Sequence, residues 1–83
     1  MKNAEPLTIS PNQVPLNQSL TVRSELENFP ANAYVITDER GRIIRKGFVS
    51  NRVTEFRLSM VGLATGVYRF TMGPVNERFT IVL

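Results

Sequence analysis

The stretch that decides the fold runs from Val67 to Leu83 and reads VYRFTMGPVNERFTIVL. From Tyr68 to Met72, aromatic and apolar side chains alternate strictly with arginine and threonine. That period of two is typical of a half-buried β-strand. The segment from Gly73 to Asn76 favours a hairpin turn, and the residues from Glu77 to Leu83 alternate again. The sequence therefore predicts two final antiparallel strands, each with one apolar face.

Similar short alternating runs recur along the rest of the chain, and helical periodicity is nearly absent. They are bounded by Gly, Pro, Asn and Asp, which favour turns. The expected strands are Leu7–Ile9, Leu20–Leu26, Ala33–Thr37, Ile43–Val49, Val53–Leu58, Val67–Met72 and Glu77–Leu83. We expect a single all-β domain over residues 7–83, an immunoglobulin-like antiparallel β-sandwich of about seven strands. Residues 1–6 are expected to be a linker or an artificial start.

Several segments carry more specific expectations. The run Ala33–Thr37 is apolar on both faces, which suits a central strand. Pro11 and Pro15 lack amide protons, so their segment can serve only as an edge or an irregular linker. The residues between Ser59 and Thr65 are expected to cross to the next strand, with room for one helical turn.

In the strand that follows the Asp38 turn, side-chain direction can also be predicted. Ile44 and Phe48 are expected to point inward and Arg45 outward, with a bulge at Gly47. The expected core follows from the same alternation along every strand. It comprises Leu20, Val22, Tyr34, Ile36, Ile44, Phe56, Leu58, Leu63, Tyr68, Phe70, Phe79 and Ile81.

The composition leaves little chemistry for catalysis. The 83 residues include no cysteine and no histidine, which excludes disulfides and removes the commonest general base and metal ligand. Asp38 and Glu39 are neighbours on an expected turn, where their side chains point apart. The serines have no histidine to activate them, and no phosphate-binding loop occurs. We therefore expect no enzyme, no catalytic residue, no metal site and no cofactor.

The chain is basic, with ten Lys and Arg against seven Asp and Glu and a formal net charge of +3. Arg40, Arg42, Arg45 and Lys46 crowd around one expected hairpin. Such a patch could contact an anionic polymer, although exposed arginines on a solvated hairpin would give the same pattern. Nucleic acid is not expected, because the aromatic residues lie at core positions and leave no stacking platform. No apolar run is long enough for a transmembrane segment.

Four segments carry recognisable patterns. They are Pro11-Asn12-Gln13 after the first strand, the Asp-x-x-Gly turn from Asp38 to Gly41, Leu63-Ala64-Thr65-Gly66-Val67-Tyr68, and the basic-then-aliphatic end from Arg78 to Leu83. In order and spacing they resemble the type A C-terminal sorting domains of the type IX secretion system of Bacteroidota. The family has proline where this chain has Gln13 and Ala64.

The resemblance implies a secretion signal domain. Such a domain folds in the periplasm and directs its parent protein across the outer membrane to the cell surface. Its partners would be translocon or shuttle components and a sortase-like peptidase. In many members the peptidase removes the domain, here near residues 2–6, and attaches the parent to anionic lipopolysaccharide. Other members keep the domain in a surface attachment complex, where the basic hairpin would suit anionic lipopolysaccharide.

Within this interpretation, the last strand is the expected recognition element. Its exposed edge and its carboxylate could be read by strand addition or carboxylate capture, through Arg78, Phe79, Ile81, Val82 and Leu83. The remaining motif residues, Pro11, Asn12, Asp38, Gly41, Leu63, Gly66 and Tyr68, also have purely structural explanations.

For three of these residues the structural explanation is specific. Gly41 would supply a turn, Gly66 a backbone shape closed to side chains, and Tyr68 a buried ring with a bonded hydroxyl. Two further hypotheses stay open. One is a dimer through strand edges, and the other is an immunoglobulin-like accessory domain that binds carbohydrate or protein.

Overall fold

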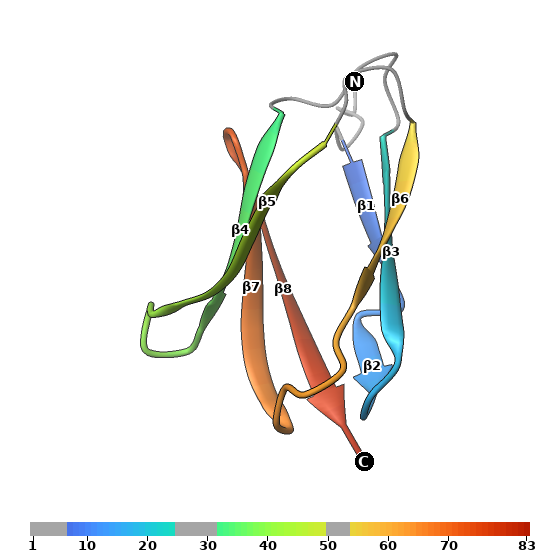
Figure 1. Ribbon diagram of the computed structural model, residues 1–83, viewed down its shortest axis with the longest axis vertical. Helices are drawn as coiled ribbons and strands as arrows, with labels where there is room; N and C mark the ends of the chain where they lie inside the picture. The colour runs from blue at the N-terminus through green and yellow to red at the C-terminus, as the bar shows by residue number, and fades with distance from the viewer. Residues whose placement is uncertain (1–6, 25–31, 50–53) are drawn as a thin grey trace, which may run out of the picture.

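The protein is a sandwich of two β-sheets that face each other (Figure 1). The structure is a computed structural model and describes residues 7–24, 32–49 and 54–83. The three-stranded sheet has the order β1 (Leu7–Ser10), β3 (Ser19–Ser24), β6 (Glu55–Ser59). The five-stranded sheet has the order β2 (Gln13–Pro15), β8 (Val75–Val82), β7 (Gly66–Met72), β4 (Ala33–Asp38), β5 (Ile43–Phe48). The expected all-β sandwich is confirmed, with eight strands in the part of the chain that the structure describes. Leu26 and the expected linker at residues 1–6 lie outside the described residues.

Strand β2 is an addition to the expected set, and it changes the environment of the last strand. It runs parallel to β8 with Val14 opposite Ile81, at the edge of the five-stranded sheet. An edge position tolerates Pro15, as the sequence predicted. A cis peptide bond joins Ser10 to Pro11 between β1 and β2, which belong to different sheets. The expected exposed edge of the last strand is therefore wrong along Thr80–Val82, because β2 covers it.

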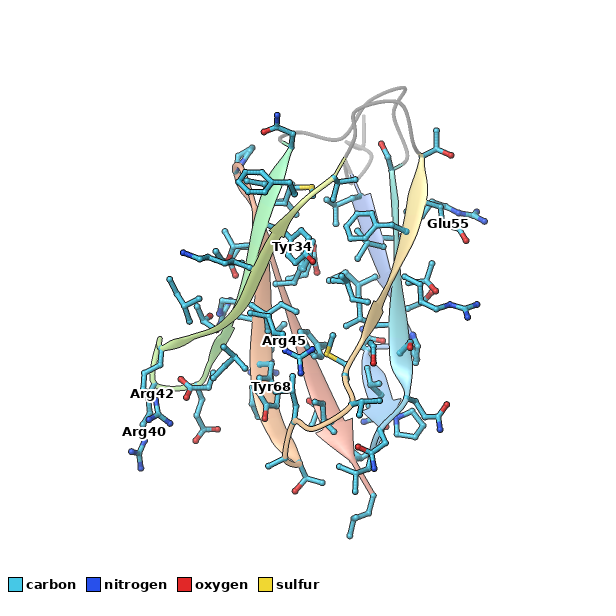
Figure 2. The ribbon with its side chains drawn as sticks, in the orientation of Figure 1. Tyr34, Arg40, Arg42, Arg45, Glu55 and Tyr68 are labelled. Atoms are coloured by element: carbon cyan, nitrogen blue, oxygen red, sulfur yellow. The ribbon has the colours of Figure 1, made fainter. Side chains whose placement is uncertain are left out.

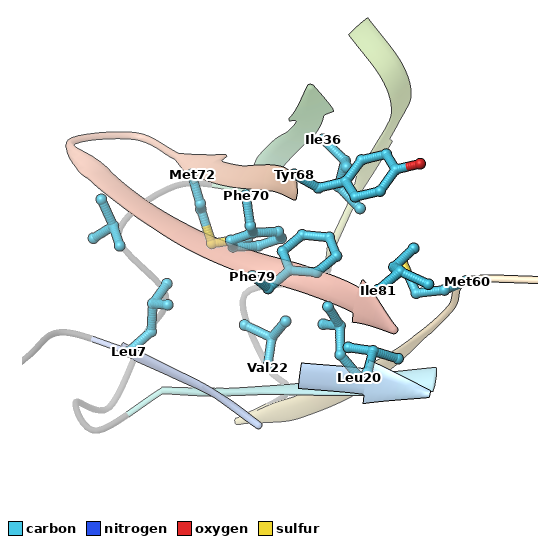
Figure 3. Close-up of a cluster of buried hydrophobic side chains, with 12 residues drawn as sticks. Leu7, Leu20, Val22, Ile36, Met60, Tyr68, Phe70, Met72, Phe79 and Ile81 are labelled. Atoms are coloured by element: carbon cyan, nitrogen blue, oxygen red, sulfur yellow. The ribbon is translucent and has the colours of Figure 1, made fainter. Parts of the chain in front are cut away.

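The core lies between the sheets and is mainly aliphatic and aromatic (Figure 3). Its buried members are Leu7, Val14, Leu20, Val22, Ile36, Met60, Tyr68, Phe70, Met72, Val75, Phe79 and Ile81. The expected core residues Tyr34, Ile44, Phe56, Leu58 and Leu63 are only partly buried and pack against it. The ring of Tyr34 in β4 stacks on the rings of Phe56 in β6 and Phe70 in β7, with ring centroids 5.7 Å apart in each pair. Aromatic rings therefore connect the two sheets.

Strand β4 lies between β7 and β5, which confirms the predicted central strand. Strand β5 differs from its prediction in side-chain direction. Arg45 lies opposite the buried Ile36 and so shares its inward face. Phe48 was expected inward but is 85% exposed.

A bulge explains the change of face in β5. Ile36 pairs with Arg45 while the next residue, Thr37, pairs with Ile43, so β5 holds one extra residue at Ile44. An extra residue reverses the face of every side chain beyond it. The sequence predicted a bulge in this strand but placed it at Gly47. A bulge at Gly47 lies after Arg45 in the strand and therefore would not change the face of Arg45.

Candidate functional site

The turn between β4 and β5 is built around Asp38. One carboxylate oxygen, Oδ1, accepts the backbone N–H groups of Arg40 at 2.9 Å and of Arg42 at 3.0 Å. The other, Oδ2, accepts Nε of Arg42 at 2.9 Å. Gly41 donates its N–H to the Asp38 carbonyl and has φ +84°, which confirms its role as the turn glycine. Asp38 therefore fixes the shape of the hairpin tip.

The Asp38 carboxylate is fully committed to this turn. Partial removal from solvent raises its pKa, but the hydrogen bonds from Arg42 and Arg40 and the charge of Arg42 together lower it more. The pKa therefore lies below its ordinary value, and the carboxylate stays ionised as a turn-forming acceptor. This geometry does not suit a general acid or base.

The crossover, residues 60–65 between β6 and β7, is fixed by contacts with several side chains. Tyr68 donates its hydroxyl to the Ala64 carbonyl at 2.7 Å, and its ring stacks on Phe79 with centroids 5.7 Å apart. Gly66 begins β7 with φ +153°, a conformation that side chains disfavour, so both structural expectations are confirmed. Leu63 packs against the core, and a turn closed by its N–H and the Met60 carbonyl takes the place of the expected helical turn.

Arg45 reaches across the open side of the sandwich to this crossover (Figure 2). Its guanidinium donates to the carbonyl oxygens of Ser59 at 2.9 Å and Val61 at 2.8 Å. On the far side of the crossover, Asn17 accepts the N–H of Gly62 at 3.3 Å. Arg45 is thus a structural cross-link between β5 and the crossover, and the expectation that it points outward is wrong.

The four cations expected to form one anionic-polymer patch do not form a single patch of free charges, although Arg40 and Arg42 line the same hollow at the hairpin tip. Arg42 is paired with Asp38, and Arg45 faces the crossover. Arg40 is exposed at the hairpin tip (Figure 2). Lys46 is exposed on β5, on the face opposite to that of its neighbour Arg45. Of these four side chains, those of Arg40 and Lys46 make no hydrogen bond or ion pair with the described residues, and they come from different parts of the hairpin.

The last strand presents some of its expected recognition residues and hides others. Phe79 and Ile81 are each 1% exposed and cannot be contacted while the domain is folded. Arg78 is exposed, Val82 is half-buried and Leu83 is 96% exposed. Any partner of the folded strand must use these outer side chains or the backbone.

The backbone edge of β8 is open at Arg78. Thr80 donates its N–H to the Asn12 carbonyl at 2.8 Å, and Val82 accepts the N–H of Leu16 at 2.7 Å, so both face β2. Because the direction alternates along a strand, the N–H and C=O of Arg78 face the same side. Strand β2 begins only at Gln13, opposite Thr80, so within the described residues no strand pairs with Arg78 there.

Arg78 also lines two hollows that bring the sequence motifs together. The first, about 430 Å³, is lined by Asp38, Gly41 and Tyr68 among others. The second, about 530 Å³, is lined by Pro11 and Asn12 among others. We call these two hollows and the Arg78 side chain between them the Arg78 site.

Arg69 is the neighbour of Arg78 that the sequence reasoning missed. It lies directly opposite Arg78 on the outer face of β7 and donates to Oδ1 of Asn76 at 2.6 Å. The signal was present in the sequence, because a two-residue turn at Gly73-Pro74 sets Met72 opposite Val75 and fixes the register of the hairpin.

No protein-family model matches the chain, and no curated protein was found that matches it. The residues that the structure describes contain no helix that could span a membrane. The same residues contain no cluster of three or more His, Cys, Asp or Glu that could hold a metal ion. The Arg78 site offers a guanidinium, a backbone donor and acceptor, and two adjoining hollows. These groups are suited to binding an extended peptide segment that carries a carboxylate.

Proposed function

We propose that this chain is a secretion signal domain of the type IX kind, recognised in its folded state at the Arg78 site. One observation carries the proposal. The four segments behind the family resemblance are far apart in sequence, yet all contribute to the two hollows around Arg78. The Pro11-Asn12-Gln13 segment contributes Pro11 and Asn12, and the Asp-x-x-Gly turn contributes Asp38. The segment that ends at Tyr68 contributes Tyr68, and the last segment contributes Arg78 itself.

The proposed recognition uses the edge and the outer face of β8. A partner segment can pair with the open N–H and C=O of Arg78, while a carboxylate on that segment binds the guanidinium. Val82 and Leu83 extend the contact along the strand with apolar surface. Translocon or shuttle components and a sortase-like peptidase are the proposed partners, and the parent protein is carried across the outer membrane to the cell surface.

The test is export of a reporter. The chain is fused to the C-terminus of a periplasmic reporter in a bacterium that has the type IX system. We expect the native fusion at the cell surface or in the medium, and the Arg78→Glu fusion in the periplasm. Arg57→Glu is the matched control, because Arg57 is exposed on β6 of the other sheet. Its fusion should be exported normally.

Two outcomes would contradict the proposal in different ways. If the native fusion is not exported, the chain is not a signal domain. If Arg78→Glu is exported like the native chain, the signal is read elsewhere. Circular dichroism of the purified domains shows whether each variant is folded, so loss of export can be separated from loss of structure.

Binding of anionic lipopolysaccharide is the second candidate, as in an uncleaved domain of a surface attachment complex. The observation that favours it is the direct juxtaposition of Arg69 and Arg78 on the outer face of the five-stranded sheet. Like charges directly opposite each other are unfavourable unless an anion neutralises them. We expect purified anionic lipopolysaccharide to bind less well to Arg69→Glu and at higher salt. Binding that is indifferent to both would exclude this candidate.

A further inference from the structure

Among the described residues, strand β5 forms the edge of the five-stranded sheet opposite to β2. Val49 donates its N–H to the Asn32 carbonyl at 2.8 Å, which marks that pair as a hydrogen-bonded one. Hydrogen-bonded pairs recur at every second position of an antiparallel ladder, so the next is Tyr34 with Gly47. The N–H and C=O groups of Lys46 and Phe48 therefore point away from β4, toward the free edge.

The side chains at this edge form a mainly apolar hollow of about 380 Å³. Its lining comprises Ala33, Tyr34, Val35, Lys46, Gly47 and Phe48. Phe48 is 85% exposed, an unusual position for a phenylalanine on an edge strand. On the inner face, the Tyr34 side chain occupies the space where a side chain of residue 47 would lie. Because residue 47 is glycine, a residue of an added strand opposite Gly47 would contact the Tyr34 ring directly.

Charge selects among possible occupants of this edge. Strand β5 carries Arg45 and Lys46 and no acidic residue. A second copy of the chain paired antiparallel would bring two Lys46 ammonium groups to the same outer face of one ladder, and lysine on an edge strand is a common way to prevent that pairing. An extended segment with an acidic side chain opposite Lys46 has the complementary charge.

We propose that the free edge of β5 is a strand-addition site for an extended, acidic segment of a partner protein. The segment pairs antiparallel to β5. Counting along the partner from its N-terminus, an apolar residue lies opposite Phe48, a larger apolar residue opposite Gly47 and against Tyr34, and an acidic residue opposite Lys46. This site is independent of the Arg78 site, because none of its lining residues lines either of the two hollows around Arg78.

The test uses the peptide acetyl-Thr-Thr-Val-Leu-Glu-Thr-amide and amide NMR spectra of the full chain. We expect saturable shifts of the Lys46, Gly47 and Phe48 amides, with Val, Leu and Glu of the peptide opposite Phe48, Gly47 and Lys46. N-methylation of the peptide's Glu removes an N–H that faces β5 and should abolish binding. N-methylation of its Leu removes an N–H that faces away and should leave binding unchanged.

Protein variants test the charge requirement. Lys46→Glu should weaken binding of the acidic peptide about fivefold and should favour a peptide with Lys in place of Glu. Arg57→Glu, the same charge change on the other sheet, should alter neither. The proposal is overturned if no saturable shift occurs, if both N-methylated peptides bind equally, or if the same amides shift with protein concentration alone. The last result would show that copies of the chain pair through β5.

Discussion

Gly41 precedes strand β5 and Gly47 lies within it, and the two positions are glycine for different physical reasons. Gly41 has φ +84° and open space around it, so only its backbone conformation excludes a side chain. Gly47 has no such φ, but a Cβ atom there would lie 2.6 Å from the Tyr34 hydroxyl oxygen and 2.8 Å from Cζ. The sequence could predict the first, because Asp-x-x-Gly marks a turn, but not the second, which depends on a residue from the neighbouring strand.

These two reasons predict different responses to alanine. Gly41→Ala should lower the free energy of unfolding by about 1–2 kcal/mol through backbone strain, in any background. Gly47→Ala should cost about 1–3 kcal/mol through overpacking, and most of that cost should vanish when Tyr34 is replaced by leucine. Urea unfolding of the single and double variants measures both. An undiminished cost of Gly47→Ala in the Tyr34→Leu background would show that the Tyr34 contact is not its cause.

Asp38 predicts a pH dependence of stability. Its pKa is lower in the folded protein than the usual value of 3.8, so its carboxylate stabilises the fold above that value. The contribution is lost as the pH falls through the folded pKa, because the protonated acid no longer pairs with Arg42. We expect Asp38→Asn to be less stable than the native chain at neutral pH and the difference to shrink in acid. Urea unfolding at several pH values measures it, and Glu39→Gln, which removes one negative charge from the same turn, is the control.

At the scale of elements, the strands with clean alternation were predictable and the irregular ones were not. Strand β7 follows its period-two pattern, with Tyr68, Phe70 and Met72 buried. Strand β4 was predictable from a different signal, a run that is apolar on both faces. Strand β2 has only three residues beside two prolines, too few to show a period, and its pairing with β8 is a long-range contact. The side-chain directions in β5 depend on a bulge whose position is set by the register with β4. The Arg78 site was therefore predictable only in part. Its motifs could be found in the sequence, but that they lie close together depends on long-range strand pairing, which the sequence does not show.

The crossover between β6 and β7 should depend on Arg45. Arg45→Met keeps the aliphatic stem and removes two charge-assisted hydrogen bonds to the Ser59 and Val61 carbonyls. Water can partly replace them, so we expect a loss of about 1–2 kcal/mol in the free energy of unfolding. Lys46→Met makes the equivalent change at the next residue, whose ammonium is exposed, and should change stability by less than about 0.5 kcal/mol. Equal effects in urea unfolding would contradict the cross-link.

For the whole molecule, the question is how much stability the thin core supplies. A domain of 83 residues is expected to have about 4–12 kcal/mol of unfolding free energy. Phe70 is fully buried and its ring lies 5.7 Å from Tyr34 and 6.5 Å from Phe56 of the opposite sheet. Loss of this one ring removes contacts within the five-stranded sheet and contacts to the three-stranded sheet.

Phe70→Ala should therefore cost about 3–5 kcal/mol, enough to leave a large fraction of the chain unfolded if the native stability is at the lower end. Phe48→Ala is the matched control, since the same atoms are removed from a side chain that is 85% exposed. Its effect should stay within about 0.5 kcal/mol. Circular dichroism during urea unfolding measures both variants. A costly Phe48→Ala would mean that Phe48 packs against this chain and is not free to receive an added strand, so this control also tests the β5 edge as a docking site.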